Sequence, residues 1–144
     1  MSRDRLSLIV FSGDYDRVHY ALVMASAAAA TNRPVTLFFT MGASKALLAP
    51  KPDGAPGWAA LAATDDGISA SNRDANHAKA GIATLEELME ACAELDVTMW
   101  VCEMGLKAEE LSLSDFRKDV TVMESGMVTF LAESEREKGH IVFI

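Results

Sequence analysis

The sequence predicts an α/β domain with a five-stranded, mainly parallel open sheet and helices on both of its faces. Two observations support this fold class. Short apolar runs alternate along the chain with segments that carry helical periodicity or helix caps. The runs are apolar at nearly every position, as expected of strands that are covered on both faces. With 144 residues, the chain is predicted to form a single domain over residues 1–144.

The strands are predicted from five runs that are rich in apolar, β-branched or aromatic residues. They are residues 6–11, 35–40, 97–102, 119–122 and 141–144. Crossovers between parallel strands are right-handed, which leaves few topologies for five strands, and an open sheet is the simplest of them.

Helices are predicted between most of these strands. They are residues 14–31, 42–48, 84–95, 103–111 and 125–138. Asp14 or Asp16 is positioned to cap the first helix, which ends before Pro34 because residues that precede a proline are pushed out of the helical region. Thr84 and Glu87 have the spacing of a capping box, which marks the start of the third helix.

Residues 49–81 are predicted to form a long, mostly irregular loop. Proline and glycine recur in this segment, and both residue types interrupt regular structure. Residues 58–63 are the stretch within it that is expected to form a short helix. A loop of this length in a small domain is usually functional, mobile or built with short helices of its own.

The charge of the chain argues against nucleic acid as a partner. Thirteen basic and 21 acidic residues give a net charge of −8, which repels phosphate backbones. The longest apolar stretch, residues 20–30, is shorter than the roughly 20 residues that a membrane span needs. Because the sequence also shows no secretory signal pattern and no disulfide scaffold, we expect a cytoplasmic protein that binds no membrane.

The sequence predicts neither a cofactor nor a metal ion. Residues 12–16, which follow the first strand, contain no phosphate-binding glycine or lysine pattern. His19, His77 and His140 lack the spacing of metal ligands. We expect His19 to be structural and His140 to lie at the opposite edge of the sheet from Cys102. His77 is either a solvated loop residue or one that folds over the functional edge.

The first helix predicts an oligomer. After Tyr20 it is almost entirely apolar and rich in alanine, and a helix that is apolar on all sides is normally buried on all sides. In a domain of this size another subunit usually provides the cover. We therefore expect a homo-oligomer.

Sites in open parallel sheets lie beyond the carboxyl ends of the strands. The segments that follow the predicted strands should therefore share one edge. The residues expected to line a pocket at this edge are Ser12, Gly13, Asp14, Thr40, Met41, Gly42, Glu103 and Ser125.

Cys102 is the candidate catalytic residue at this edge. It ends a predicted strand and precedes a predicted helix, whose N–H groups and dipole stabilise a thiolate. Glu103 opposes this effect with its own negative charge. The alternative is a purely structural role, because free cysteines are among the most buried residues.

Cys92 is predicted to be a core residue, because it lies on the apolar face of its helix with Leu88 and Leu95. The two cysteines are not expected to form a disulfide. Cys92 lies about one helical turn before the turn at Asp96, whereas Cys102 lies well beyond it along an extended strand. Their Cα atoms should therefore be farther apart than the ~7 Å that a disulfide tolerates.

Several of these segments together resemble the DsrE/DsrF-like family. They are the alanine-rich first helix and residues 12–18, 35–40, 84–88 and 101–104. The resemblance implies an α/β domain with flavodoxin-like layering that assembles into trimers or hexamers. In the sulfur-relay members, a cysteine at the position of Cys102 accepts sulfur as a persulfide and passes it to a partner protein. Relatives often carry aromatic residues where this chain has residues 41–43.

The main hypothesis is a small sulfur-carrier or sulfurtransferase-type protein that holds a persulfide on Cys102. Its partner is then a protein that donates or accepts sulfur. The alternative is a non-enzymatic, oligomeric protein that binds a small ligand in a pocket that Cys102 only lines. A third idea, a redox sensor based on Cys102, is disfavoured because the sequence places no resolving cysteine nearby.

Overall fold

A computed structural model describes residues 4–136 and 138–144. It contains one five-stranded sheet with the strand order β4-β3-β2-β1-β5, and every neighbouring pair is parallel. The strands are β1 (Leu6–Val10), β2 (Val35–Phe39), β3 (Thr98–Cys102), β4 (Val122–Ser125) and β5 (His140–Phe143). The predicted α/β fold class is therefore confirmed.

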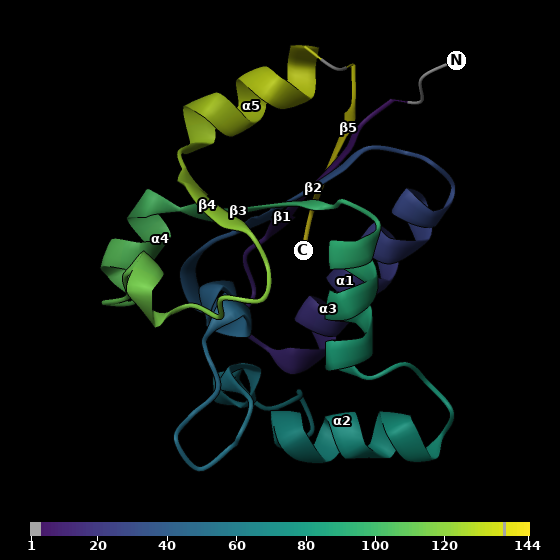
Figure 1. The fold of residues 1–144 in the computed structure, drawn as a ribbon, viewed down its shortest axis with the longest axis vertical. Helices are drawn as coiled ribbons and strands as arrows, with labels where there is room; N and C mark the ends of the chain where they lie inside the picture. Colours follow the sequence, from purple (N-terminus) through teal and green to yellow (C-terminus); the bar gives the residue numbers. More distant parts are fainter. Residues whose placement is uncertain (1–3, 137) are drawn as a thin grey trace.

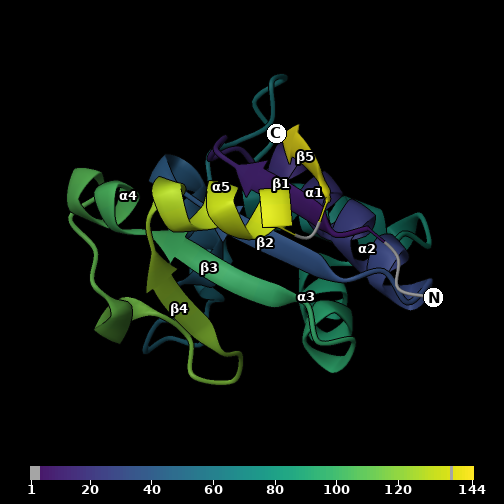
Figure 2. The ribbon, with the colours of Figure 1, turned by 90° about the horizontal axis from the view of Figure 1, so that it is seen from above.

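The two faces of the sheet are covered unequally. Helices α1 (Tyr15–Ala30) and α3 (Leu85–Glu94) pack against each other and against one face, whereas α5 (Met127–Arg136) lies on the other (Figures 1 and 2). The larger core cluster lies on the α1 and α3 side. A second, small cluster lies under α5 and is built on Phe38, Cys102 and Phe130.

Short elements connect these layers. They are the 3-10 helices η1 (Met41–Leu47), η2 (Gly57–Ala60) and η3 (Leu113–Asp115), and the α-helices α2 (Ala70–Lys79) and α4 (Glu103–Ala108). Helix α2 lies at the opposite end of the molecule from α5, beyond α1 and α3 (Figure 1).

The predicted caps account for the starts of two helices. The carboxylate of Asp14 accepts a hydrogen bond from the backbone N–H of Arg17 (2.9 Å), which makes Asp14 the N-cap of α1. Thr84 and Glu87 form the predicted capping box of α3, with both reciprocal hydrogen bonds present.

Two predicted elements differ from the structure. The fourth strand lies three residues later than expected, at Val122–Ser125, because Arg117 binds Asp119 and holds the start of the predicted run in the preceding loop. The segment 49–81 is less irregular than expected, because it contains η2 and the ten-residue helix α2. Ser69 caps α2 through the N–H of Asn72 (3.2 Å). The helix could not be predicted from apolar periodicity, because its sequence is mostly polar.

The first helix is buried on one face within the described chain and not on all sides. Its buried residues include Val18, Leu22 and Ala25, whereas 61% of Tyr20 is exposed. The prediction that another subunit covers the exposed side of this helix stays a prediction. Over residues 4–136 and 138–144, no helix combines the length and apolar character needed to cross a membrane.

Candidate functional site

Cys102 is the last residue of β3 and stands at the N-cap of α4. Strand residues alternate between the two faces of a sheet, and this alternation places Val101 in the large core and Cys102 in the cluster under α5. The predicted position at a strand end is therefore confirmed in the backbone. The side chain, however, points into the layer between the sheet and α5 and not beyond the edge.

The thiol of Cys102 is covered in this conformation. Only 7% of the residue is exposed, and its cluster contains Phe38 and Phe130, with Ile9 and Trp100 packed against them. The rings of Phe38 and Phe130 have their centroids 4.7 Å apart. The candidate catalytic thiol is therefore not open at the sheet edge, because α5 supplies an aromatic cover that sequence spacing does not indicate.

Cys92 is a core residue, as predicted. It is fully buried, its Sγ lies 3.8 Å from the carbonyl oxygen of Leu22, and burial raises the pKa of its thiol to about 12. The structure describes both cysteines as free thiols. Cys92 is therefore an inert internal reference for the reactivity of Cys102.

The ends of β1 and β2 meet, but their backbones fill the space between them. A Cβ atom on Gly13 would lie 3.0 Å from the backbone of Gly42, and one on Gly105 would lie 2.5 Å from the backbone nitrogen of Met41. The predicted gathering of these segments at one edge is therefore observed. Glycine at these positions allows the backbones to approach this closely.

Asp14 serves as a helix cap at this edge. Burial acts to raise the pKa of Asp14, but hydrogen bonds from the Arg17 backbone and from the side chains of Ser12 and Arg17 outweigh it and lower the pKa. The Ser12 hydroxyl donates to the carboxylate at 2.7 Å. Asp14 is therefore held as an anion that caps α1.

The expected lining residues fall into three groups. Ser12, Gly13 and Asp14 lie beside Ala62, whose N–H donates to the Gly13 carbonyl (2.8 Å). Ser125 is instead the strand partner of Cys102 in β4.

The remaining expected residues surround the start of α4. Thr40 is buried and approaches Gly105, whereas Glu103, the first residue of α4, is exposed. Met41 and Gly42 are half-buried at the start of η1.

Two of the larger surface cavities lie away from the thiol. One of about 460 Å³ lies between α1 and β5 and is lined by Asp14, Tyr20 and Val142 among others. Another, of about 400 Å³, lies beside β3 and β4 and includes Trp100 and Met123. Trp100 connects this second cavity with the cluster that contains Cys102.

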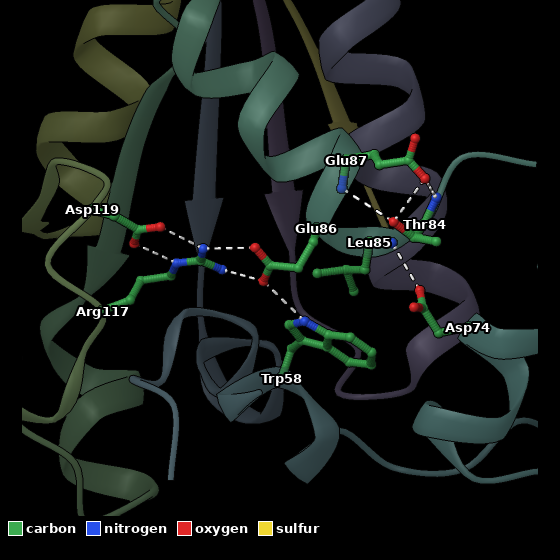
Figure 3. A network of polar contacts seen from close by, with 8 residues as sticks. All are labelled: Trp58, Asp74, Thr84, Leu85, Glu86, Glu87, Arg117 and Asp119. Carbon is green, nitrogen blue, oxygen red and sulfur yellow. Dashed lines mark hydrogen bonds and ion pairs between the residues drawn. The ribbon is translucent and has the colours of Figure 1, made fainter. Parts of the chain in front are cut away.

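A polar network near α3 was not predicted (Figure 3). The guanidinium of Arg117 donates to both oxygens of Glu86 (2.7 and 2.9 Å) and to both oxygens of Asp119 (2.7 and 2.7 Å). The indole N–H of Trp58 also donates to Glu86 (3.0 Å). Trp58, Glu86 and Arg117 are far apart in the sequence and follow no motif, so only the fold brings them together.

A cluster of buried aromatic and titratable side chains forms a second unpredicted feature. His77 lies on α2 and is buried, so the alternative that it is a solvated loop residue is wrong. It contacts Tyr15 and His19 of α1. His19 is buried, as expected of a structural residue. His140 begins β5 at the far end of the strands from Cys102 and is exposed.

The chain belongs to the DsrE/DsrF-like family, which matches residues 6–143. Among curated proteins, it is similar to the sulfur carrier protein DsrE2 of Allochromatium vinosum. The two are 29% identical over 136 residues, which span 81% of this chain and 84% of the relative.

Among solved structures, the chain is similar to the protein of unknown function MTH1491 from Methanobacterium thermoautotrophicum. The TM-score is 0.62 at 12% identity, and the match covers 99% of this chain and 100% of that one. At this level of identity the likeness shows the fold alone.

Proposed function

We propose that this protein is a sulfur carrier that holds a persulfide on Cys102 and passes its outer sulfur to a partner protein. Membership of the DsrE/DsrF-like family and the similarity to a sulfur carrier support a role in sulfur relay. The observation that carries the assignment to Cys102 is its place at the end of β3, directly before α4. Cys92 is unsuited, because burial raises the pKa of its thiol to about 12.

Loading requires one exchange at sulfur. The Cys102 thiol gives its proton to solvent, and the thiolate attacks the outer sulfur of a donor persulfide or of thiosulfate. A new S–S bond forms on Cys102, and the bond between that sulfur and the donor breaks. The donor leaves with the electron pair, as a thiolate or as sulfite. Transfer to an acceptor thiolate repeats the exchange, with Cys102 as the leaving thiolate.

The cover over Cys102 fits a carrier that must protect its cargo. A persulfide enclosed by Phe38 and Phe130 is shielded from solvent thiols, which would otherwise remove the outer sulfur. Both loading and transfer then require α5 to move away from the sheet. In the ten-residue helix α5 only Phe130 and Ser134 are buried, so few contacts oppose this movement.

We include assembly and location in the proposal. Apolar side chains on and near α5 are strongly exposed, among them Val128 (85%) and Met123 (60%), as on surfaces that other subunits or partners cover. The family resemblance suggests trimers or hexamers. The two free thiols suit a reducing compartment such as the cytoplasm.

The test is the intact mass of the protein after incubation with thiosulfate or a persulfide donor. We expect an added mass of about 32 Da, one sulfur atom, that is removed by a reducing thiol. The matched variants are Cys92→Ser, which should keep the adduct, and Cys102→Ser, which should lose it. An unmodified wild type, or an equal adduct in Cys102→Ser, would contradict the proposal.

The alternative of a ligand-binding protein has less support. It requires a pocket that Cys102 lines, whereas the two cavities described above are lined by other residues. Thermal-shift measurements with small sulfur-containing compounds separate the two functions. A ligand that stabilises wild type and Cys102→Ala equally, in a protein that forms no persulfide, would favour the alternative.

A further inference from the structure

Helix α2 is attached to the rest of the molecule almost entirely through polar side chains. Of its ten residues only Ala70 and His77 are buried, so it contributes little apolar surface to the core. A helix normally gains most of its stability from packing an apolar face. The polar contacts of α2 therefore decide whether it stays in place.

Asp74 provides the central contact. Its carboxylate accepts hydrogen bonds from the hydroxyl of Tyr15 (2.5 Å) and from the backbone N–H of Leu85, the first residue of α3 (2.8 Å). Arg73 adds an ion pair with Asp16 at 3.0 Å, at a more exposed position. Helix α2 is thus tied to the starts of both α1 and α3.

His77 completes the attachment, and its burial beside a second imidazole favours the neutral form. The Tyr15 proton is used for Asp74, so Nδ1 of His77, 3.3 Å from the Tyr15 oxygen, must carry the hydrogen of that contact. The other histidine, His19, holds the segment that links α2 to α3, because its Nε2–H donates to the carbonyl of Ala83 (2.8 Å). The two imidazole rings have their centroids 4.4 Å apart.

The surroundings of His77 disfavour a positive charge on it. Burial lowers the pKa of His77 below 6.5, and the neighbouring His19 of α1 and Arg73 of α2 lower it further. Asp16 of α1 and Asp74 of α2 act in the opposite direction but do not compensate.

The other elements near His77 contribute aromatic and acidic side chains. The ring of Tyr15 on α1 lies 5.7 Å from the His77 ring. Trp58 of η2 packs against Tyr15 with 6.0 Å between ring centroids, and α3 contributes Glu86, which is bound to Trp58 and Arg117.

We propose that His77, with Tyr15, His19 and Asp74, forms a pH-sensitive latch that holds α2 on the body of the protein at neutral pH and releases it on acidification. Release exposes the fully buried ring of Tyr15 and the first turns of α1. The cluster around Cys102 stays folded, because it contains no residue of α2, and α2 lies at the opposite end of the molecule from α5 (Figure 1).

The direction of the pH dependence follows from proton linkage. A released His77 has the ordinary pKa of about 6.5 and binds a proton more tightly than the packed residue does. The contribution of His77 to attachment is therefore complete above pH ~6.5 and is lost as the pH falls through the lowered pKa of the packed residue.

The test is hydrogen exchange between pH 7.5 and 5.5, corrected for intrinsic exchange rates. Protection of residues 70–79 should fall by up to about tenfold for each pH unit between pH ~6.5 and the lowered pKa of the packed His77, while the protection of α3 beyond Leu85 stays constant. The variant His77→Gln should remove this dependence on pH. The control is His140→Gln, a change at an exposed histidine, which should retain the dependence. Parallel loss of protection in α2 and α3, or a persistent dependence in His77→Gln, would overturn the latch.

A second measurement covers the case in which His77→Gln does not fold. The imidazole protons of His77 in the wild-type protein, followed by NMR, should titrate below 6.5, and the amide signals of α2 should shift with the same midpoint. A His77 that titrates without any change in the α2 amides would also overturn the proposal.

Discussion

Val101 and Cys102 are neighbours in β3, yet their side chains enter different parts of the core. The position of Cys102 at the end of a strand is predictable from the apolar run that it terminates. The face of the sheet to which its side chain points is not predictable, because a strand that is apolar on both faces shows no alternation of polar and apolar residues. Its cover is not predictable either, because Phe130 reaches it from a helix that is distant in the sequence.

Phe130→Leu tests this cover. A smaller side chain should loosen α5 at a cost of about 1 kcal/mol and increase the rate at which iodoacetamide alkylates Cys102 several-fold. The control is Val128→Ala, a change at an 85% exposed residue of the same helix. Mass spectrometry reports both cysteines, and an equal increase at Cys92 would indicate general unfolding instead.

Gly13 offers a second prediction for a single residue. Gly13→Ala places a Cβ 3.0 Å from the Gly42 backbone, which cannot move aside easily, so we expect a loss of about 1–3 kcal/mol in the free energy of unfolding. Gly126→Ala is the matched control, since its Cβ would meet nothing within 4 Å. Urea unfolding of both variants provides the comparison, and equal midpoints would contradict the close approach.

Among the elements, the helices with strong caps follow the sequence most closely. α1 and α3 begin where Asp14 and the Thr84 capping box place them. The starts of β4 and α2 are not located by apolar patterns in the sequence. β4 is an edge strand in which Met123 and Glu124 are exposed, and α2 has no apolar stripe.

The Arg117 network stabilises the connection between α3 and β4. Its side chain is 9% exposed and binds two carboxylates, so Arg117→Met should lower the free energy of unfolding by about 1–3 kcal/mol. Arg136→Met, at a 69% exposed ion pair with Glu133, is the control and should be nearly neutral. A similar shift in the urea midpoint of both variants would contradict this role.

The same network predicts a dependence on pH. Hydrogen bonds from Arg117 lower the pKa of Asp119 below 3.8. The stabilisation is therefore present above pH ~4 and is lost as the pH falls through the lowered pKa of Asp119. Arg117→Met should show a smaller loss of stability between pH 4 and 2.5 than the wild type does. An unchanged acid profile in the variant would argue against the interaction.

At the scale of the whole molecule, large exposed apolar side chains gather on and near α5, whereas the outer side of α1 carries mainly alanines and Tyr20. The composition of α1 predicts an oligomer but does not indicate which surface is covered. Light scattering should give the mass of three or six chains. A monomer at micromolar concentration would contradict the proposed assembly.

Because one lightly anchored helix covers one side of the sheet and two well-packed helices cover the other, the two thiols should respond differently to denaturant. Labelling of Cys102 requires only the fraying of α5 and should accelerate gently with urea, whereas labelling of Cys92 requires cooperative melting of the main core and should rise steeply. The two cysteines of one chain would thus report two different processes. Labelling of Cys102 would report local opening, and labelling of Cys92 would report global unfolding.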